Sequence, residues 1–119
     1  MIKPSDLRIG NYVLAEVGLP CMELHTIRAK DIVDYESGKI PIGSIKPIPI
    51  TEKLLTNLGF VTPPTFQITW RFLNGFGLHR HIGNWYWNDT VNQVKLTSLH
   101  QLQNLYYALS EKELEINIL

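Results

Sequence analysis

Apolar residues recur along the chain with two different periods, and each period predicts a different kind of element. The clearest helical pattern covers residues 98–109, where leucine or tyrosine returns at three- and four-residue steps and forms one apolar stripe. Ser98 followed by Gln101 matches a capping box, so we expect the helix to begin at that serine. The stripe must be covered, and the aromatic segments just upstream are the surface that we expect to cover it.

A shorter helix is predicted over residues 52–58. Thr51 is placed to cap its first turn, and Gly59 can adopt the left-handed conformation that ends a helix. Because so short a helix is unstable alone in water, its leucines must pack on another part of the chain.

Alternating apolar and polar residues predict an antiparallel β-meander in the middle of the chain. The alternation is clearest over residues 66–72, and a returning strand over 76–82 follows the Asn-Gly turn signal at 74–75. Further short strands that begin near Trp85 lead up to the longer helix. The meander is rich in aromatic residues on more than one strand.

The length of the hairpin loop decides which side chains share a face of this meander. A two-residue loop places Trp70 opposite His79, whereas a three-residue loop places Trp70 opposite Arg80. We prefer the three-residue loop, because it matches apolar with apolar residues across the strands. In that register His79 and His81 lie on the polar face.

The N-terminal part has shorter signals. Residues 4–9 predict a single helical turn, residues 29–31 predict a turn, and the prolines within 40–50 reduce that segment to an edge strand or an extended arm. Short alternating segments predict strands here and at the C-terminus, over residues 12–17, 22–28, 32–35 and 113–118.

These patterns together predict an α+β fold. It consists of a curved antiparallel sheet, SH3-like in its N-terminal part, with the short helix 52–58 and the longer helix 98–109 packed on an aromatic β-meander. A length of 119 residues fits one domain, and the Pro-Pro pair at 63–64 divides it into candidate subdomains 1–60 and 65–119.

Composition narrows the possible functions. Lys plus Arg and Asp plus Glu number 11 each, so the net charge is zero and nucleic acid is disfavoured as a partner. The single cysteine, Cys21, excludes an internal disulfide and suits a reducing compartment. Neither a signal peptide nor a long apolar run is present, so we expect a location in the cytoplasm of a bacterial host cell and no membrane contact.

Catalytic motifs are absent from the sequence, and we expect no catalytic residue, metal or cofactor. The pair His79 and His81 has a spacing that metal sites use, which leaves a metal-dependent enzyme as an alternative. The positive charge of Arg71 and Arg80 beside this pair opposes a cation. A third ligand would have to come from His25, His100, Asp89 or Cys21.

The outer face of the 98–109 helix is polar but contains no charged residue. Solvated helix faces normally carry charges, whereas protein interfaces deplete them and retain tyrosine. We therefore predict a contact surface for another protein, or for a second copy of this chain. Its residues are His100, Gln103, Asn104 and Tyr107, with Trp85 and Trp87 as additional anchors.

Three stretches resemble a family of small Bacteroidetes proteins carried on phages and mobile elements, to which no activity is attached. They are residues 6–11 (DLRIGN), 46–60 (KPIPITEKLLTNLGF) and 99–114 (LHQLQNLYYALSEKEL). The resemblance implies a phage or mobile-element setting. We therefore expect a non-enzymatic accessory protein that binds a protein and can modulate a host process. The second alternative is an SH3-like nucleic-acid module that uses the aromatic residues with Arg71, Arg80 and Lys95.

Overall fold

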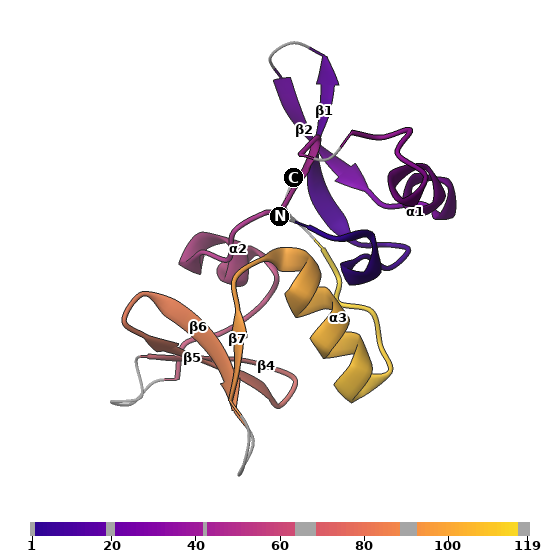
Figure 1. Ribbon diagram of the computed structural model, residues 1–119. Helices are drawn as coiled ribbons and strands as arrows, with labels where there is room; N and C mark the ends of the chain where they lie inside the picture. Colours follow the sequence, from indigo (N-terminus) through magenta and orange to yellow (C-terminus); the bar gives the residue numbers. More distant parts are fainter. Residues whose placement is uncertain (1, 19–20, 42, 64–68, 89–92, 117–119) are drawn as a thin grey trace. The chain divides into compact units, whose positions relative to one another are not determined.

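The structure is a computed structural model that describes residues 2–18, 21–41, 43–63, 69–88 and 93–116 (Figure 1). Over these residues the fold is α+β, as predicted, with two antiparallel sheets and three α-helices. The elements in chain order are the 3-10 turn η1 (Pro4–Asp6), β1 (Tyr12–Gly18), β2 (Cys21–Thr26), α1 (Ala29–Glu36), β3 (Ile45–Lys46), α2 (Glu52–Asn57), β4 (Trp70–Leu73), β5 (Phe76–His81), β6 (Asn84–Asn88), β7 (Gln93–Leu96) and α3 (Leu99–Ser110).

The chain divides into two compact units. Unit 1 consists of Met1–Pro49 and Ser98–Leu105, and unit 2 consists of Ile50–Thr97 and Tyr106–Leu119. The boundary therefore falls after Pro49, rather than at the Pro-Pro pair that suggested subdomains 1–60 and 65–119. Helix α3 contributes residues to both units, which are described separately below.

Unit 1 contains a three-stranded sheet in the order β2-β1-β3. Its strands are short and antiparallel, as an SH3-like arrangement would have them, but the sheet is open and does not close into a barrel. A small aliphatic core includes Val13, Ile27 and Ile45, and the buried Tyr35 hydroxyl donates a 2.6 Å hydrogen bond to the carbonyl of Ile2. β3 is only two residues long, which agrees with the arm expected from the proline-rich segment.

Helix α1 replaces the turn and strand predicted over residues 29–35, so that prediction was wrong. Ile32 and Tyr35 pack against the core of unit 1, while Val33 is 61% exposed. Burial three residues apart is the helical period, and the β-branched Ile-Val pair wrongly suggested a strand. Asp31 helps the helix to begin, because its carboxylate accepts the backbone N–H of Arg28 at 2.9 Å.

Helix α2 in unit 2 confirms the short helix predicted over 52–58. Thr51 Oγ1 accepts the backbone N–H of Leu54 at 3.1 Å, which is the expected cap. At the other end Gly59 has φ +98°, and the N–H of Phe60 returns to the carbonyl of Leu55 at 3.0 Å.

Strands β4 to β7 form the predicted meander, an open sheet in the order β4-β5-β6-β7. The hairpin turns through two residues, Asn74 and Gly75, which have φ values of 50° and 82°. Trp70 consequently lies opposite His79, so the preferred three-residue register was wrong. A two-residue turn with positive φ at both positions matches the right-handed twist of the flanking strands. This preference outweighs the pairing of apolar residues across the two strands.

The sheet of unit 2 has two chemically different faces. The core face carries buried apolar residues, which are Phe76, Leu78, Trp85 and Leu96. The outer face carries Trp70, His79 and Tyr86, which are partly buried, and Lys95, which is exposed. Trp70 and Phe72 pair with His79 and Gly77, so they lie on the face opposite the buried Phe76 and Leu78.

Helix α3 confirms the longer predicted helix. In unit 2 the ring of Tyr106 meets that of Phe76 edge to face at 5.4 Å, and its hydroxyl accepts Asn74 Nδ2 at 3.3 Å. The part of the helix in unit 2 thus packs on the aromatic meander through Tyr106, as predicted, whereas Leu109 of the predicted stripe is 50% exposed. The strand expected over 113–118 is absent from residues 113–116, and the rest of that segment lies outside the described residues.

Candidate functional site

The polar residues of α3 were predicted to form an exposed contact surface, but two of them are buried. Gln103 lies in the interior of unit 1, where its Oε1 accepts the N–H of Tyr12 at 2.8 Å and its Nε2 donates to the carbonyl of Gly10 at 3.1 Å. His100 is also buried, and its Nδ1 lies 3.1 Å from Ser98 Oγ. Burial lowers the pKa of His100, and the charge of Asp6 opposes that shift.

Asn104, which is partly buried, continues this internal network. Its Oδ1 accepts Asn11 Nδ2 at 2.9 Å and Arg8 Nε at 3.2 Å, while its Nδ2 donates to the carbonyl of Asp6 at 3.0 Å. The amides of this helix face thus satisfy a loop of the same unit, which accounts for uncharged polar residues at these positions. Of the four predicted helix residues, Tyr107 is the one that is exposed, at 42%.

The three stretches that carry the family resemblance meet in this network. Residues 6–11 supply Arg8 and Asn11, and residues 99–114 supply the two amides that bind the N-terminal loop. The third stretch joins through Ile48, whose carbonyl accepts the N–H of Leu99 at 2.8 Å. Part of each stretch therefore lies in unit 1, while residues 50–60 and 106–114 belong to unit 2.

The two predicted tryptophan anchors lie on the core face of the unit 2 sheet. Trp85 is buried, and the guanidinium of Arg71 lies 5.8 Å from the centre of its ring. Trp87, two residues along the same strand, is partly buried on that face. Tyr86 points to the opposite face, so it is the aromatic residue of β6 that the sheet presents outward.

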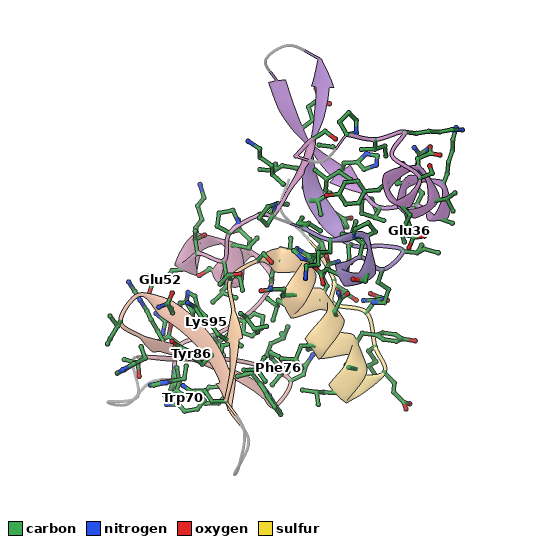
Figure 2. The ribbon with its side chains drawn as sticks, viewed as in Figure 1. Glu36, Glu52, Trp70, Phe76, Tyr86 and Lys95 are labelled. Carbon is green, nitrogen blue, oxygen red and sulfur yellow. The ribbon has the colours of Figure 1, made fainter. Side chains whose placement is uncertain are left out.

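A row of four side chains crosses the outer face of the sheet, one from each strand. Trp70 pairs with His79, His79 with Tyr86, and Tyr86 with Lys95. Figure 2 shows Trp70, Tyr86 and Lys95 on this sheet. Directly opposed residues share a face, so the row is continuous from β4 to β7. We call these four residues the aromatic row.

Ring stacking extends the aromatic row along the strands. Trp70 and Phe72 stack with their ring centres 5.6 Å apart and their planes within 5°, and His79 lies 5.0 Å from Trp70. Gly77 makes room for them, because a Cβ there would lie 2.8 Å from Phe72 Cε1. His81 adds a fourth ring, 6.2 Å from His79.

The charge of this sheet differs from that of the whole chain. Its strands contain three cationic side chains and no Asp or Glu in residues 70–73, 76–81, 84–88 and 93–96. Lys95 belongs to the outer face, whereas Arg71 and Arg80 project to the other face. Overall neutrality therefore conceals a locally basic sheet.

The histidines considered as metal ligands lie in both units. His79 and His81 share the outer face, and His25 is held 2.9 Å from the Asp31 carboxylate in unit 1. Asp89 and the side chain of Cys21 lie outside the described part of the chain. Within that part, no group of three or more His, Cys, Asp or Glu side chains could hold a metal ion.

Comparison with known proteins yields no match: no protein-family model, no curated protein and no solved structure corresponds to this chain. Among the described residues, no helix is both long and apolar enough to cross a membrane. The geometry of the outer sheet face is therefore the principal guide to function.

Proposed function

We propose that this chain is a non-enzymatic binding protein of the phage or mobile-element type, and that the outer face of its β4–β7 sheet binds single-stranded nucleic acid. The observation that carries the proposal is the aromatic row, which places Trp70, His79, Tyr86 and Lys95 side by side on a face without carboxylates in its described residues. This surface replaces the helix face, whose amides are engaged inside unit 1.

Ring stacking supplies the sequence-tolerant part of such binding. Neighbouring strands lie about 4.8 Å apart, so Trp70 and Tyr86 are roughly 10 Å apart and can each stack on a different base of one strand. Stacking on an aromatic side chain contributes about 1–3 kcal/mol per base. Lys95, at the end of the row, is placed to contact a backbone phosphate.

Fluorescence anisotropy with a labelled oligothymidine of about 12 nucleotides tests this proposal directly. The double variant Trp70→Ala, Tyr86→Ala should bind at least about tenfold more weakly, because two stacking surfaces are removed. Trp70→Phe should retain most of the affinity. Val33→Ala, which truncates an exposed side chain in unit 1, is the control and should bind like the unchanged protein.

The salt dependence provides a second, independent measurement. Lys95→Gln should reduce the slope of log Kd against log salt by about 0.7, the value expected when one contact to a single-strand phosphate is lost. Equal affinities of the double variant and the unchanged protein, with far-UV circular dichroism showing both folded, would rule out the aromatic row as the binding surface.

A second candidate function is protein binding in the form of self-association. Tyr107 is 42% and Leu109 is 50% exposed in the last turns of α3, and neither residue lies in the buried amide network. Tyr107→Lys should shift a dimer toward monomer in sedimentation velocity if this candidate is right. A chain that is monomeric at every concentration before substitution excludes it.

A further inference from the structure

A second feature of unit 2 is a cavity of about 440 Å³ that the aromatic row does not use. It is lined by the ionic side chains of Glu52, Arg71 and Arg80, by Thr62 and Thr69, and by Ile82 and Gly83 of the turn that follows β5. Arg71 and Arg80 alternate with Trp70 and His79 along their strands, so they project to the other face of the sheet. This cavity is therefore distinct from the proposed nucleic-acid surface.

One carboxylate oxygen holds two guanidinium groups in this cavity. Glu52 Oε1 accepts Arg71 Nη2 at 2.8 Å and Arg80 Nη1 at 3.1 Å. The side chain of Arg71 is only 13% exposed, whereas those of Arg80 and Glu52 are about half exposed, at 48% and 53%. The three ionised groups leave an excess of one positive charge.

The sheet itself positions Arg71, independently of Glu52. Its Nη1 donates to the carbonyl of Trp70 at 2.8 Å, and its guanidinium lies over the ring of Trp85. A guanidinium fixed in this way remains in place if Glu52 turns aside, because its hydrogen bond and its ring contact are made to the sheet. Arg71 is thus preorganised for an anion, and Glu52 lies where an anion shared with Arg80 would bind.

We propose that this cavity binds a phosphate group, with Glu52 acting as an internal competitor for the two arginines. Arginine pairs recognise phosphate through parallel charged hydrogen bonds, and a carboxylate oxygen uses the same donors. Thr62 and Thr69 also line the cavity, and a threonine hydroxyl is able to donate to a further phosphate oxygen. The excess positive charge favours an anion and opposes a metal cation.

Inorganic phosphate is the probe, and the Nε–H resonances of the arginines in a nuclear magnetic resonance titration are the readout. Phosphate should shift the Arg80 resonance of the unchanged protein. Arg80→Gln should weaken binding, followed through the Arg71 resonance, at least about tenfold, because a charged hydrogen-bond donor is lost. Glu52→Gln should strengthen binding by about fivefold, because the competing negative charge is removed.

Arg80→Gln is expected to weaken phosphate binding and Glu52→Gln to strengthen it. A general loss of structure would weaken binding in both variants, so the pair of measurements separates it from competition. Lys39→Gln, which removes an exposed positive charge in unit 1, is the control and should leave phosphate binding unchanged. Thermal unfolding of Glu52→Gln must remain cooperative, since an acidic residue at the start of α2 also stabilises that helix. Arg80→Lys, which retains the charge, should recover part of the affinity.

Two outcomes would overturn the proposal. The first is that folded Glu52→Gln protein shows no shift with millimolar phosphate, since its competitor is gone. The second is that an oligonucleotide shifts the Arg80 resonance while inorganic phosphate does not, which would assign Arg80 to an extended polyanion. Failure of oligonucleotide binding alone would affect the aromatic row and leave this phosphate site intact.

Discussion

The polar face of α3 in unit 1 and the outer face of the sheet in unit 2 differ in an instructive way. The helix face has the composition of an interface, but Gln103 is fully enclosed and binds the backbone of Gly10 and Tyr12. The sheet face has the composition of a core, but Trp70 and Tyr86 lie on the side opposite the buried residues.

The difference shows that composition alone does not identify a binding surface. Uncharged amides are well suited to satisfy loop backbone in the interior, because each carries both donors and an acceptor. Aromatic rings on an outer sheet face are not covered by the same core and remain able to stack on a ligand. In this protein the buried amides stabilise unit 1, and the outer aromatic rings carry the binding function proposed above.

The largest expected effect comes from removing the buried amide of α3. Gln103→Leu leaves the N–H of Tyr12 and the carbonyl of Gly10 without their partner, so it should lower the free energy of unfolding by about 3 kcal/mol. Urea denaturation measures the change. Ala108→Leu, an exposed position on the same helix, is the control and should change stability by less than about 0.5 kcal/mol. Equal effects at both positions would contradict the proposed role of the network.

The second largest effect on stability is expected from the ionised carboxyl group of Asp31 in unit 1. Burial alone would raise its pKa, but the hydrogen bonds from His25 and from Arg28 outweigh this and lower the pKa from 3.8 to about 2. A lowered carboxyl pKa stabilises the fold above pH 3.8, and this stabilisation is lost as the pH falls from there toward 2.

Asp31→Asn should therefore lower the free energy of unfolding by about 2 kcal/mol near neutral pH and have little effect near pH 2. Denaturant unfolding at a series of pH values measures the difference between the two proteins. Asp34→Asn, on the same helix, is the matched control. A difference that does not change with pH would exclude ionisation of Asp31 as the source of the stability.

A smaller effect is expected at Gly77, beneath the stacked rings of the outer face. Gly77→Ala should displace the Phe72 ring, because the new Cβ would lie 2.8 Å from it. The ring can move, so the cost should be only about 1 kcal/mol, but the stack with Trp70 should be disturbed. Near-ultraviolet circular dichroism should change while the far-ultraviolet spectrum does not, and oligonucleotide affinity should fall. An unchanged aromatic signal would contradict the described packing.

The smallest effect is the titration of His100 in unit 1. Its lowered pKa means that the unfolded chain binds the proton more readily, so stability is complete above 6.5, the ordinary imidazole pKa, and decreases below it. The slope from one proton cannot exceed about 1.4 kcal/mol per pH unit. His100→Gln should reduce this slope, as measured by unfolding between about pH 5 and pH 7. If the unfolding free energy of His100→Gln depends on pH as steeply as that of the unchanged protein, another group is responsible for the dependence.

Local signals were sufficient to predict several elements of this fold. The Thr51 cap and Gly59 define helix α2, the Asn-Gly pair at 74–75 defines the hairpin turn, and the apolar stripe defines α3. Each signal depends on residues only a few positions apart, and such interactions are present in the chain before it folds. The aromatic row could also have been predicted, had the two-residue turn been preferred over apolar pairing.

Tertiary structure decided which faces are covered. The pattern of residues 70–82 shows which side chains alternate, but only packing determined that Phe76 and Leu78 face the core while Trp70 faces outward. The same holds for Gln103, whose partner Tyr12 lies 91 positions away in the chain. Residues that share a face can be found from periodicity, because the period is a local property. What covers that face depends on segments that meet only when the chain folds, and this is why the burial of Gln103 could not be predicted from the pattern of α3 alone.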